Sequence, residues 1–437
     1  MIPLGIEWWS PEVLYMDTNT ISRRSLLQKS SIAGASATTF QIIRPELVRG
    51  AGKAKLKAGL VGFGGRGRQA VVDMIAGTIN VDFVAVGDIF EDHISANLQW
   101  LRNNPKVADR IKVDPEHQFT GFDAFRKVIA SDVDIVMLAT PPGYRPEHFE
   151  AAINAKKHVF CEKPFGTDPV GVRRFMAAAK KSEELKLSVM SGAQRRHQRE
   201  YVETIDKIKN GAIGDITATY AYWVGSPVIQ QKARDPKWGD MAWQHRAWYS
   251  FVWICGDQIV EQHLHNIDVI NWVMGTHPVK VTATGGAVWR PKEELYGNIY
   301  DHISADFEYP NGVRMSSYCR QFPRGSSNKI AELIVGSKGK SNGHDLAAPG
   351  SASVPYVAEH TALLNSIRGD GPYINHAMAV AESTMTCIMA RESAYSGTDL
   401  TWDMMMNSKL DLQPKAFDYD LKMEVPPLPV PGVYKFI

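Results

Sequence analysis

The segment that most constrains the fold is a glycine-rich turn between an apolar strand pattern and a helical pattern. Residues 56–67 read LKAGLVGFGGRG, in which Gly62, Gly64 and Gly67 have the spacing Gly-x-Gly-x-x-Gly. Gly62 permits a tight turn, Gly64 lets the backbone approach a pyrophosphate, and Gly67 lets the following helix pack closely on the strand. The positive end of that helix dipole attracts phosphate. The turn is therefore predicted to bind a dinucleotide through Gly62, Phe63, Gly64, Gly65, Arg66 and Gly67.

The next strand pattern, VDFVAVGD at residues 81–88, strengthens this prediction because it ends in an acid. Asp88 follows the last glycine of the turn by about 20 residues, the spacing at which a carboxylate accepts hydrogen bonds from ribose hydroxyls. The negative charge of Asp88 would repel the additional 2′-phosphate of NADP. The predicted cofactor is therefore NAD, with NADP less favoured.

Strand and helix patterns alternate from residue 51 to residue 192, which predicts parallel strands joined by right-handed crossovers. This part is expected to be a doubly wound NAD-binding domain of the Rossmann type. Thr140 and Pro141 follow a strand at its carboxyl end, the edge at which such sheets bind ligands, so both are predicted to contact the cofactor. The expected strands span residues 56–62, 81–88, 134–140, 157–161 and 187–191, and the expected helices span residues 66–76, 93–102, 122–130, 146–155 and 169–185.

The pattern changes after residue 192, where β-rich segments with partial alternation are interrupted by helical ones. Residues 193–437 are expected to form a second, α+β domain that binds substrate and oligomerises, with a mostly antiparallel open sheet. Asn311-Gly312 is predicted to be a hairpin turn. Whether the C-terminal segment packs back on the first domain is left open. The expected strands span residues 216–224, 279–288, 302–309, 313–318 and 330–335, and the expected helices include residues 196–210 and 377–395.

Composition excludes several other classes of protein. A chain of 437 residues is long enough for two domains, and its net charge of +2 provides no basic surface for nucleic acid. The four cysteines show no CxxC spacing, which argues against a zinc site or a disulfide framework. No stretch is long and apolar enough to predict a membrane span.

Residues 1–50 do not resemble a domain. Residues 22–29 read SRRSLLQK, and a mildly apolar run of small residues follows to Phe40, so this leader resembles a twin-arginine export signal. The alternative is a disordered basic leader. Export predicts a periplasmic location and the twin-arginine machinery as a partner. Because free nicotinamide nucleotide is scarce outside the cytoplasm, it also predicts NAD that is loaded before export and held tightly.

The sequence HVFCEKP at residues 158–164 ends a strand with Glu162, Lys163 and Pro164. A lysine at this edge faces the nicotinamide, where it can hold a substrate hydroxyl and lower its pKa. The segment resembles the glucose–fructose oxidoreductase/inositol dehydrogenase (Gfo/Idh/MocA) family. Glu162 and Lys163 are predicted to contact the cofactor, and Lys163 is also predicted to be catalytic. Arg145 stands where that family often has histidine, and it is expected not to touch the chemistry.

The segment from Gly256 to Gly275 is predicted to be a helix that carries the remaining catalytic groups. Glu261, His265 and Asp268 recur at helical spacing and share one face, whereas His263 points elsewhere. His265 is therefore the predicted proton acceptor, and Glu261 orients it or raises its pKa. The family has an acid four residues before a histidine, with a glycine between them where this chain has His263, so a contact of His263 with substrate is left open. The spacing cannot bring Glu261, His263 and His265 to one ion, and no metal is predicted.

Two further segments are predicted to line the substrate pocket. One follows the last strand of the first domain, and the other, rich in aromatic residues, precedes the catalytic helix. Aromatic rings and guanidinium groups suit the stacking and hydrogen bonding of sugars. The predicted substrate-binding residues are Arg196, His197, Trp243, Arg246, His263 and Asp268.

These features predict an NAD-dependent oxidoreductase that acts on a secondary hydroxyl of a sugar, cyclitol or related polyol. Lys163 and His265 would hold the hydroxyl between them, with Lys163 stabilising the developing alkoxide. One alternative is an exported glycoside hydrolase that oxidises and re-reduces its substrate on retained NAD. Another is a non-catalytic binding protein on the same fold. The family resemblance implies a homodimer or homotetramer formed through the open sheet face.

Overall fold

The computed structural model describes residues 55–77, 80–228, 233–291, 293–323, 325–350 and 354–437. The predicted twin-arginine leader at residues 1–50 lies outside the described residues, so export stays a prediction. Among the described helices, none combines the length and the apolar character that crossing a bilayer requires.

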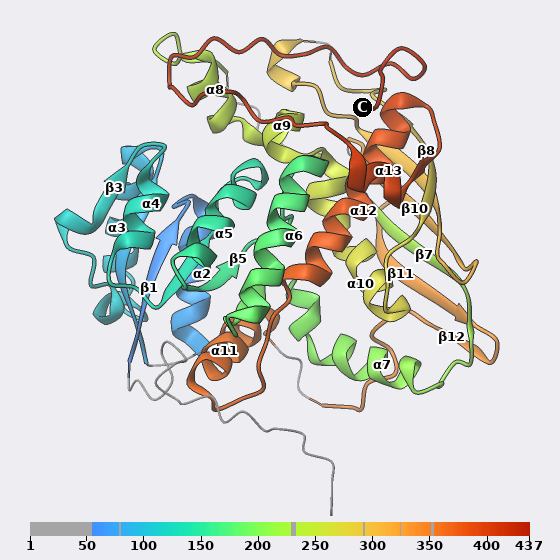
Figure 1. The fold of residues 1–437 in the computed structure, drawn as a ribbon, viewed down its shortest axis with the longest axis horizontal. Coiled ribbons are helices and arrows are strands. Elements are labelled where there is room, and N and C mark those ends of the chain that lie inside the picture. The colour runs from blue at the N-terminus through green and yellow to red at the C-terminus, as the bar shows by residue number, and fades with distance from the viewer. Residues whose placement is uncertain (1–54, 78–79, 229–232, 292, 324, 351–353) are drawn as a thin grey trace, which may run out of the picture. The chain divides into compact units, whose positions relative to one another are not determined.

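The first sheet has six parallel strands in the order β3-β2-β1-β4-β5-β6, with β1 and β4 at its centre. This confirms the predicted doubly wound parallel sheet. Figure 1 labels β1, β3 and β5 of this sheet. Every predicted strand is present, although four are shorter than expected. β3 was missed because three residues are too few to show a hydrophobic period. The strands are β1 (Leu56–Val61), β2 (Val81–Asp88), β3 (Gln118–Thr120), β4 (Ile135–Leu138), β5 (His158–Cys161) and β6 (Val189–Ser191).

Helices connect these strands and cover the sheet. α2 buries Ala70, Val71 and Met74 because these residues recur on one helical face. α6 begins at a capping aspartate, since the side chain of Asp168 accepts a hydrogen bond from the Gly171 N–H at 2.7 Å. The helices of this part are α2 (Gly65–Gly77), α3 (Glu91–Arg102), α4 (Ala124–Ala130), α5 (Arg145–Asn154) and α6 (Pro169–Glu184).

A late helix also belongs to this layer. α11 (Pro355–Arg368) packs against α2 and places Leu363, Leu364 and Ile367 in the core beneath the parallel sheet. The contact with α2 is close, because a Cβ on Gly77 would lie 2.5 Å from the Thr361 hydroxyl. The C-terminal part of the chain therefore does return to the first sheet.

The second sheet has seven strands in the order β12-β11-β7-β10-β9-β8-β13, and only β7 and β10 pair in parallel. This confirms the predicted, mostly antiparallel sheet. The Asn311-Gly312 turn joins β9 to β10, with Gly312 in the left-handed region at φ +79°. The strands are β7 (Ile216–Gly225), β8 (Lys280–Gly286), β9 (His302–Glu308), β10 (Arg314–Gln321), β11 (Lys329–Gly336), β12 (Gly339–Ser341) and β13 (Leu400–Thr401).

Two of the predicted helices differ in detail. The segment predicted as one helix from 196 to 210 begins as a 3₁₀ turn at Gln194–His197 and continues as an α-helix, in which Val202 is exposed. The predicted catalytic helix starts with a π-helical turn at Ile259–His263 and ends at Gly275 as expected. The helices of this part are α7 (Arg199–Lys209), α8 (Asp240–Arg246), α9 (Val252–Cys255), α10 (Leu264–Met274), α12 (Ala377–Ser396) and α13 (Trp402–Asn407).

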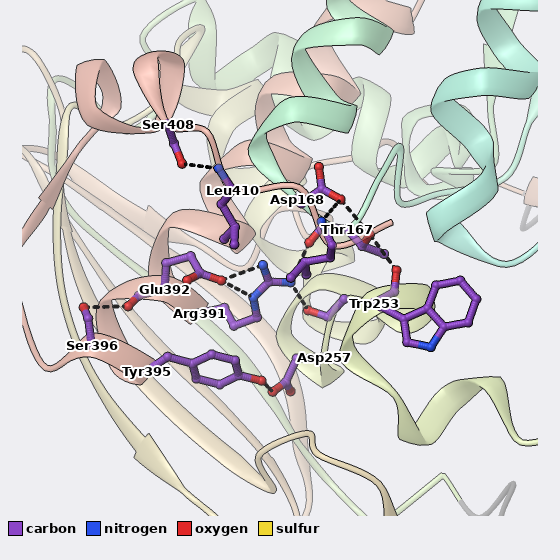
Figure 2. A network of polar contacts seen from close by, with 12 residues as sticks. Thr167, Asp168, Trp253, Asp257, Arg391, Glu392, Tyr395, Ser396, Ser408 and Leu410 are labelled. Carbon is purple, nitrogen blue, oxygen red and sulfur yellow. Dashed lines mark hydrogen bonds and ion pairs between the residues drawn. The ribbon is translucent and has the colours of Figure 1, made fainter. Parts of the chain in front are cut away.

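α12 packs against both α6 and the second sheet, and its buried Arg391 joins segments that are distant in sequence (Figure 2). The guanidinium donates hydrogen bonds to the carbonyls of Thr167 at 2.7 Å and Gly256 at 2.9 Å. Its charge is paired with Glu392 at 2.6 Å. Thr167 follows the Glu-Lys-Pro segment and Gly256 precedes the predicted catalytic helix, so Arg391 links the two segments.

We expect Arg391→Met to lower the free energy of unfolding by about 3–5 kcal/mol, because it leaves the buried Glu392 unpaired and two buried carbonyls without donors. Arg314→Met is the matched control. Arg314 pairs with Asp306 and Glu308 on the surface, where such pairs contribute about 0–1 kcal/mol. Urea unfolding of both variants measures the difference, and equal losses would contradict this account of Arg391.

Candidate active site

A single cavity of about 840 Å³ contains most of the predicted functional residues. It lies at the carboxyl ends of β1, β2, β4 and β5. Part of its wall comes from β7 of the second sheet and from the helical segments between β7 and β8. Ligands of doubly wound sheets bind at this edge. Its lining includes the glycine turn, Asp88, Lys163, Glu261 and His265.

The glycine turn has the geometry that a dinucleotide site needs. Gly62 has φ +90°, in the left-handed region. A Cβ on Gly67 would lie 2.0 Å from the Gly62 carbonyl oxygen, so only glycine allows this approach of helix to strand. A Cβ on Gly64 or Gly65 would meet nothing within 4 Å, and both residues line the cavity. These positions leave the open cradle that a pyrophosphate requires.

Asp88 lies at the cavity wall beside this turn. Its carboxylate accepts hydrogen bonds from the N–H groups of Phe63 at 2.6 Å and Phe90 at 2.9 Å. His93 lies 3.2 Å from the same carboxylate. These contacts hold the carboxylate at the edge where a ribose would bind. A carboxylate at this place can accept hydrogen bonds from the ribose hydroxyls, so the site fits NAD. The Phe63 side chain lies in the core and does not line the cavity, so the predicted cofactor contact of Phe63 is limited to its backbone.

The other predicted cofactor residues lie around the same cavity. Thr140 and Pro141 line it after β4. Arg66 and Glu162 also line it, but they bind each other, with 2.5 Å between Arg66 Nε and Glu162 Oε1. Arg66 further contacts Asp73 at 3.1 Å. The Arg66–Glu162 pair therefore joins the glycine turn to the Glu-Lys-Pro segment.

Lys163 is paired with Glu261 across the cavity wall. Lys163 Nζ lies 3.0 Å from Glu261 Oε1 and also donates a hydrogen bond to the Glu261 carbonyl. Both side chains are only 11% exposed. The expectation that Glu261 orients His265 is therefore wrong, because this carboxylate orients Lys163. Glu261 lies in the π-helical turn Ile259–His263, so the regular α-helical spacing on which the predicted stripe rested does not hold at this residue.

His265 faces the cavity next to this pair, with its ring stacked on Trp223 at 5.9 Å. Burial, followed by the positive charges of Lys163, Arg195 and Arg66, lowers the pKa of His265 well below the ordinary value of 6.5. The predicted increase of this pKa is thus wrong. A neutral imidazole at neutral pH is nevertheless the form that a proton acceptor needs. Its Nδ1 has no hydrogen-bond partner among the described residues.

Most of the predicted substrate-binding residues lie outside the cavity. Arg196 and Asp268 bind each other through two hydrogen bonds of 2.8 Å, and the ring of His197 packs at a tilt against that of His376, with 5.1 Å between the ring centres. The side chain of His263 points toward the second sheet, as expected, and lies 2.8 Å from the Ser317 hydroxyl. These side chains pack the seam between the domains, so we withdraw their predicted contacts with substrate.

The aromatic segment before the catalytic helix also differs from its prediction. Trp243 is buried against Phe251 and does not line the cavity. Arg246 does line it, but beside the end of β2, where it pairs with Asp92 at 2.9 Å. Arg246 is therefore at the side of the cavity that holds Asp88, away from the side of Lys163 and His265.

Three residues near His265 were not among the predicted site residues. Trp223 lies on β7, and its position in the cavity depends on strand register, which no local pattern gives. Arg195 lines the cavity and pairs with Glu332, although its neighbours Arg196 and His197 were chosen instead. Gln262 also lines the cavity. In the 3₁₀ turn at 194–197, the side chain of Arg195 faces the cavity, whereas those of Arg196 and His197 do not.

Arg145 is a further correction. Its buried guanidinium lines the cavity and donates a 2.8 Å hydrogen bond to the carbonyl of Pro164, the residue after Lys163. Its Nε has no hydrogen-bond partner among the described residues. Arg145 thus supports the segment that carries Lys163, whereas the sequence suggested no connection with the chemistry.

The fold and this site define a two-domain oxidoreductase that binds NAD at a Rossmann sheet. A family model described as "Oxidoreductase family, NAD-binding Rossmann fold" matches residues 56–191, and one described as "GFO/IDH/MocA C-terminal domain" matches residues 201–341. The chain therefore belongs to the Gfo/Idh/MocA family. This confirms the predicted family and the predicted class of enzyme, an NAD-dependent dehydrogenase.

Curated relatives include an inositol 2-dehydrogenase of Rhizobium meliloti, which is 26% identical over 65% of this chain and 74% of that protein. A myo-inositol 2-dehydrogenase of Thermotoga maritima is 22% identical over 47% of this chain and 51% of that protein. Among solved structures, scyllo-inositol dehydrogenase of Lactobacillus casei, crystallised with NAD(H) and scyllo-inositol, is 19% identical. Its TM-score of 0.61, over 79% of this chain and 99% of that one, shows a shared fold.

The glycine turn offers a matched pair of variants. Gly67→Ala forces a backbone shift, so we expect it to lower the free energy of unfolding by about 1–3 kcal/mol. Gly64→Ala should leave the thermal unfolding midpoint unchanged, since its Cβ has space, but weaken NADH binding by ~10-fold because it obstructs the pyrophosphate. Thermal unfolding and NADH fluorescence titration separate the two effects. Equal behaviour of both variants would refute the assignment.

The charges around His265 predict its titration. Because its pKa is lowered, its imidazole should remain neutral as the pH falls through about 6.5, where a free histidine gains half a proton. Removing the positive charge of Lys163 with Lys163→Met should raise this pKa, although burial still keeps it below the ordinary value. NMR titration of the His265 ring, assigned with His265→Gln, measures both. A wild-type pKa at or above 6.5 is incompatible with this geometry.

Proposed function

We propose that this protein oxidises a secondary hydroxyl of a sugar, cyclitol or related polyol, with NAD as the hydride acceptor. The observation that carries the proposal is the arrangement of the Lys163–Glu261 pair and His265 on the wall of the cavity that contains the glycine turn. The names of the inositol dehydrogenases among the relatives support a polyol substrate. When bound, NAD supplies the position that receives the hydride.

In this proposal the chain's own residues bind the substrate hydroxyl and move its proton. Lys163 Nζ donates a hydrogen bond to the hydroxyl oxygen and stabilises negative charge as it develops there. Glu261 holds the ammonium group of Lys163 in place through the 3.0 Å contact. Neutral His265 accepts the hydroxyl proton. Trp223, which stacks on His265, provides an apolar face for the carbon skeleton of the ring.

We further propose NAD rather than NADP, retained over many turnovers. Asp88 at the ribose position supports the choice of NAD, because its carboxylate would repel a 2′-phosphate. Retention follows from the proposed export of the folded protein by the twin-arginine pathway, which rests on the twin arginines in the SRRSLLQK segment at residues 22–29. A protein that carries its cofactor into a compartment poor in nicotinamide nucleotides has to reoxidise it in place.

A homo-oligomer is also part of the proposal. The outer face of the second sheet carries the rings of Tyr220, Tyr222 and Tyr318, of which Tyr222 and Tyr318 stack 5.5 Å apart. An apolar and aromatic sheet face of this kind favours association with a second copy. Dimers or tetramers formed through this face agree with the family resemblance.

We expect Lys163→Ala and His265→Ala each to lower the oxidation rate by at least ~100-fold, because each removes a group that stabilises charge or accepts a proton in the reaction. His263→Gln is the matched control. It lies in the same helical segment but points to Ser317, and glutamine can keep that hydrogen bond, so its rate should stay near that of the wild type. The measurement is turnover of inositols and sugars with product analysis.

The products decide between the proposal and its alternative. A ketone product from a free polyol or sugar supports a dehydrogenase. Release of an aglycone from a glycoside, without net oxidation, identifies a glycoside hydrolase that uses the same residues. Wild-type rates in both Lys163→Ala and His265→Ala would contradict the site assignment for either reaction.

A further inference from the structure

The two ends of the cavity are distinguished by the order of the parallel strands. β1, which leads into the glycine turn, lies between β2 and β4, and the next strand beyond β4 is β5, which leads to Lys163. A dinucleotide with its pyrophosphate at the glycine turn therefore has its reacting end toward β5 and its adenosine half toward β2. The β2 side, with Asp88 and Phe90, is the adenosine end of the cavity.

The wall of the adenosine end comes from two segments outside the Rossmann sheet. α8 contributes His245 and Arg246 to the cavity lining, and residues 411–425 of the C-terminal segment pack behind it; we call the two segments together the α8–tail wall. The two segments are hydrogen-bonded: the N–H of Ala242 donates to the Tyr419 carbonyl at 3.4 Å, and the N–H of Met423 donates to the Asp240 carboxylate at 3.0 Å. Figure 1 shows the red C-terminal chain running alongside α8.

The α8–tail wall is attached directly to the loop after β2. Arg246 forms two hydrogen bonds with the Asp92 carboxylate, of 2.9 and 3.0 Å, and its guanidinium lies 3.9 Å from the centre of the Phe90 ring. The Tyr419 hydroxyl donates a hydrogen bond to the Ile89 carbonyl. The loop that carries the predicted ribose ligand is therefore held by the α8–tail wall at two points.

The inner surface of this region is aromatic. His245 lies 5.6 Å from Phe122 and is hydrogen-bonded to the Tyr144 hydroxyl, and all three residues line the cavity. Burial lowers the pKa of His245 to about 4, so the ring is neutral and presents an aromatic face. Phe417 packs behind Phe122 at 5.7 Å. Flat aromatic and guanidinium groups of this kind suit the stacking of an adenine base.

We propose that the α8–tail wall binds the adenosine half of NAD and sets the rate at which NAD leaves. Arg246 and His245, which line the cavity, contact the nucleotide, and Tyr419 is a positioning residue that holds the wall against Ile89. The Nε of Arg246 is buried without a hydrogen-bond partner among the described residues and remains available to a ligand. The inference deepens the proposed retention of NAD, on which it rests, by naming the residues responsible.

The test measures nucleotide release from the full chain. Protein loaded with NADH is mixed with excess NAD, and the loss of energy transfer from tryptophan to NADH gives the release rate. Arg246→Ala should release NADH at least ~10-fold faster and lose a similar factor in affinity for ADP-ribose, because it removes a cation–aromatic contact and the link to Asp92. Tyr419→Phe, which removes a single hydroxyl that does not line the cavity, should release NADH several-fold faster.

Arg174→Ala, on the exposed surface of α6 where Arg174 pairs with Glu150 away from the wall, is the control and should release NADH at the wild-type rate. Thermal unfolding without nucleotide shows whether each variant folds, and Tyr419→Phe gives a result even where Arg246→Ala does not fold. Wild-type release rates and ADP-ribose affinities in both wall variants overturn the inference. Rapid release of NADH by the wild-type protein would refute the proposed retention of NAD but not the role of the α8–tail wall. That role is tested by the ratio of the variant and wild-type release rates.

Discussion

The arrangement of the site depends on one buried charge. Arg391 has no exposed surface and binds the carbonyls of Thr167 and Gly256, so a single guanidinium holds the segment after Lys163 against the start of the helix that carries Glu261. Figure 2 shows how these segments meet at α12. A buried guanidinium with a charged partner and two carbonyl acceptors is rigid, because moving any one contact leaves a polar group unsatisfied. Arg391 therefore holds in place the two segments that bring Lys163 and Glu261 into contact.

The sequence was sufficient where function depends on residues close together in the chain. The glycine turn, Asp88 and Lys163 were all found, because each is defined by its place at the end of a strand. The same reasoning failed where it assumed a regular helix. Glu261 lies in a π-helical turn at Ile259–His263 and contacts Lys163 rather than His265, and no period in the sequence reveals an extra residue in a turn.

Residues brought in from the second sheet and from the chain's end were less accessible to prediction. Trp223 reaches the cavity through the register of β7, and Arg195 does so through a 3₁₀ turn that sends its neighbours Arg196 and His197 outward. Arg246 was predicted to bind substrate, but the fold places it beside the end of β2, where it pairs with Asp92. Its position follows from the contact between α8 and residues near 420, a pairing of segments more than 170 residues apart that only the fold reveals.

The two ends of the cavity are thus built by different physical means. At the reacting end, ions are paired and oriented: Glu261 holds Lys163, and burial together with the surrounding positive charges lowers the pKa of His265 and keeps its ring neutral. At the adenosine end the wall is aromatic and is attached to the β2 loop by Arg246 and Tyr419. In the proposed reaction, the charged groups at the reacting end have to stabilise the developing alkoxide more than the substrate hydroxyl. The adenosine end only has to bind the nucleotide. On the function proposed above, this separation would allow strong retention of NAD without a change in the groups that bind the substrate hydroxyl.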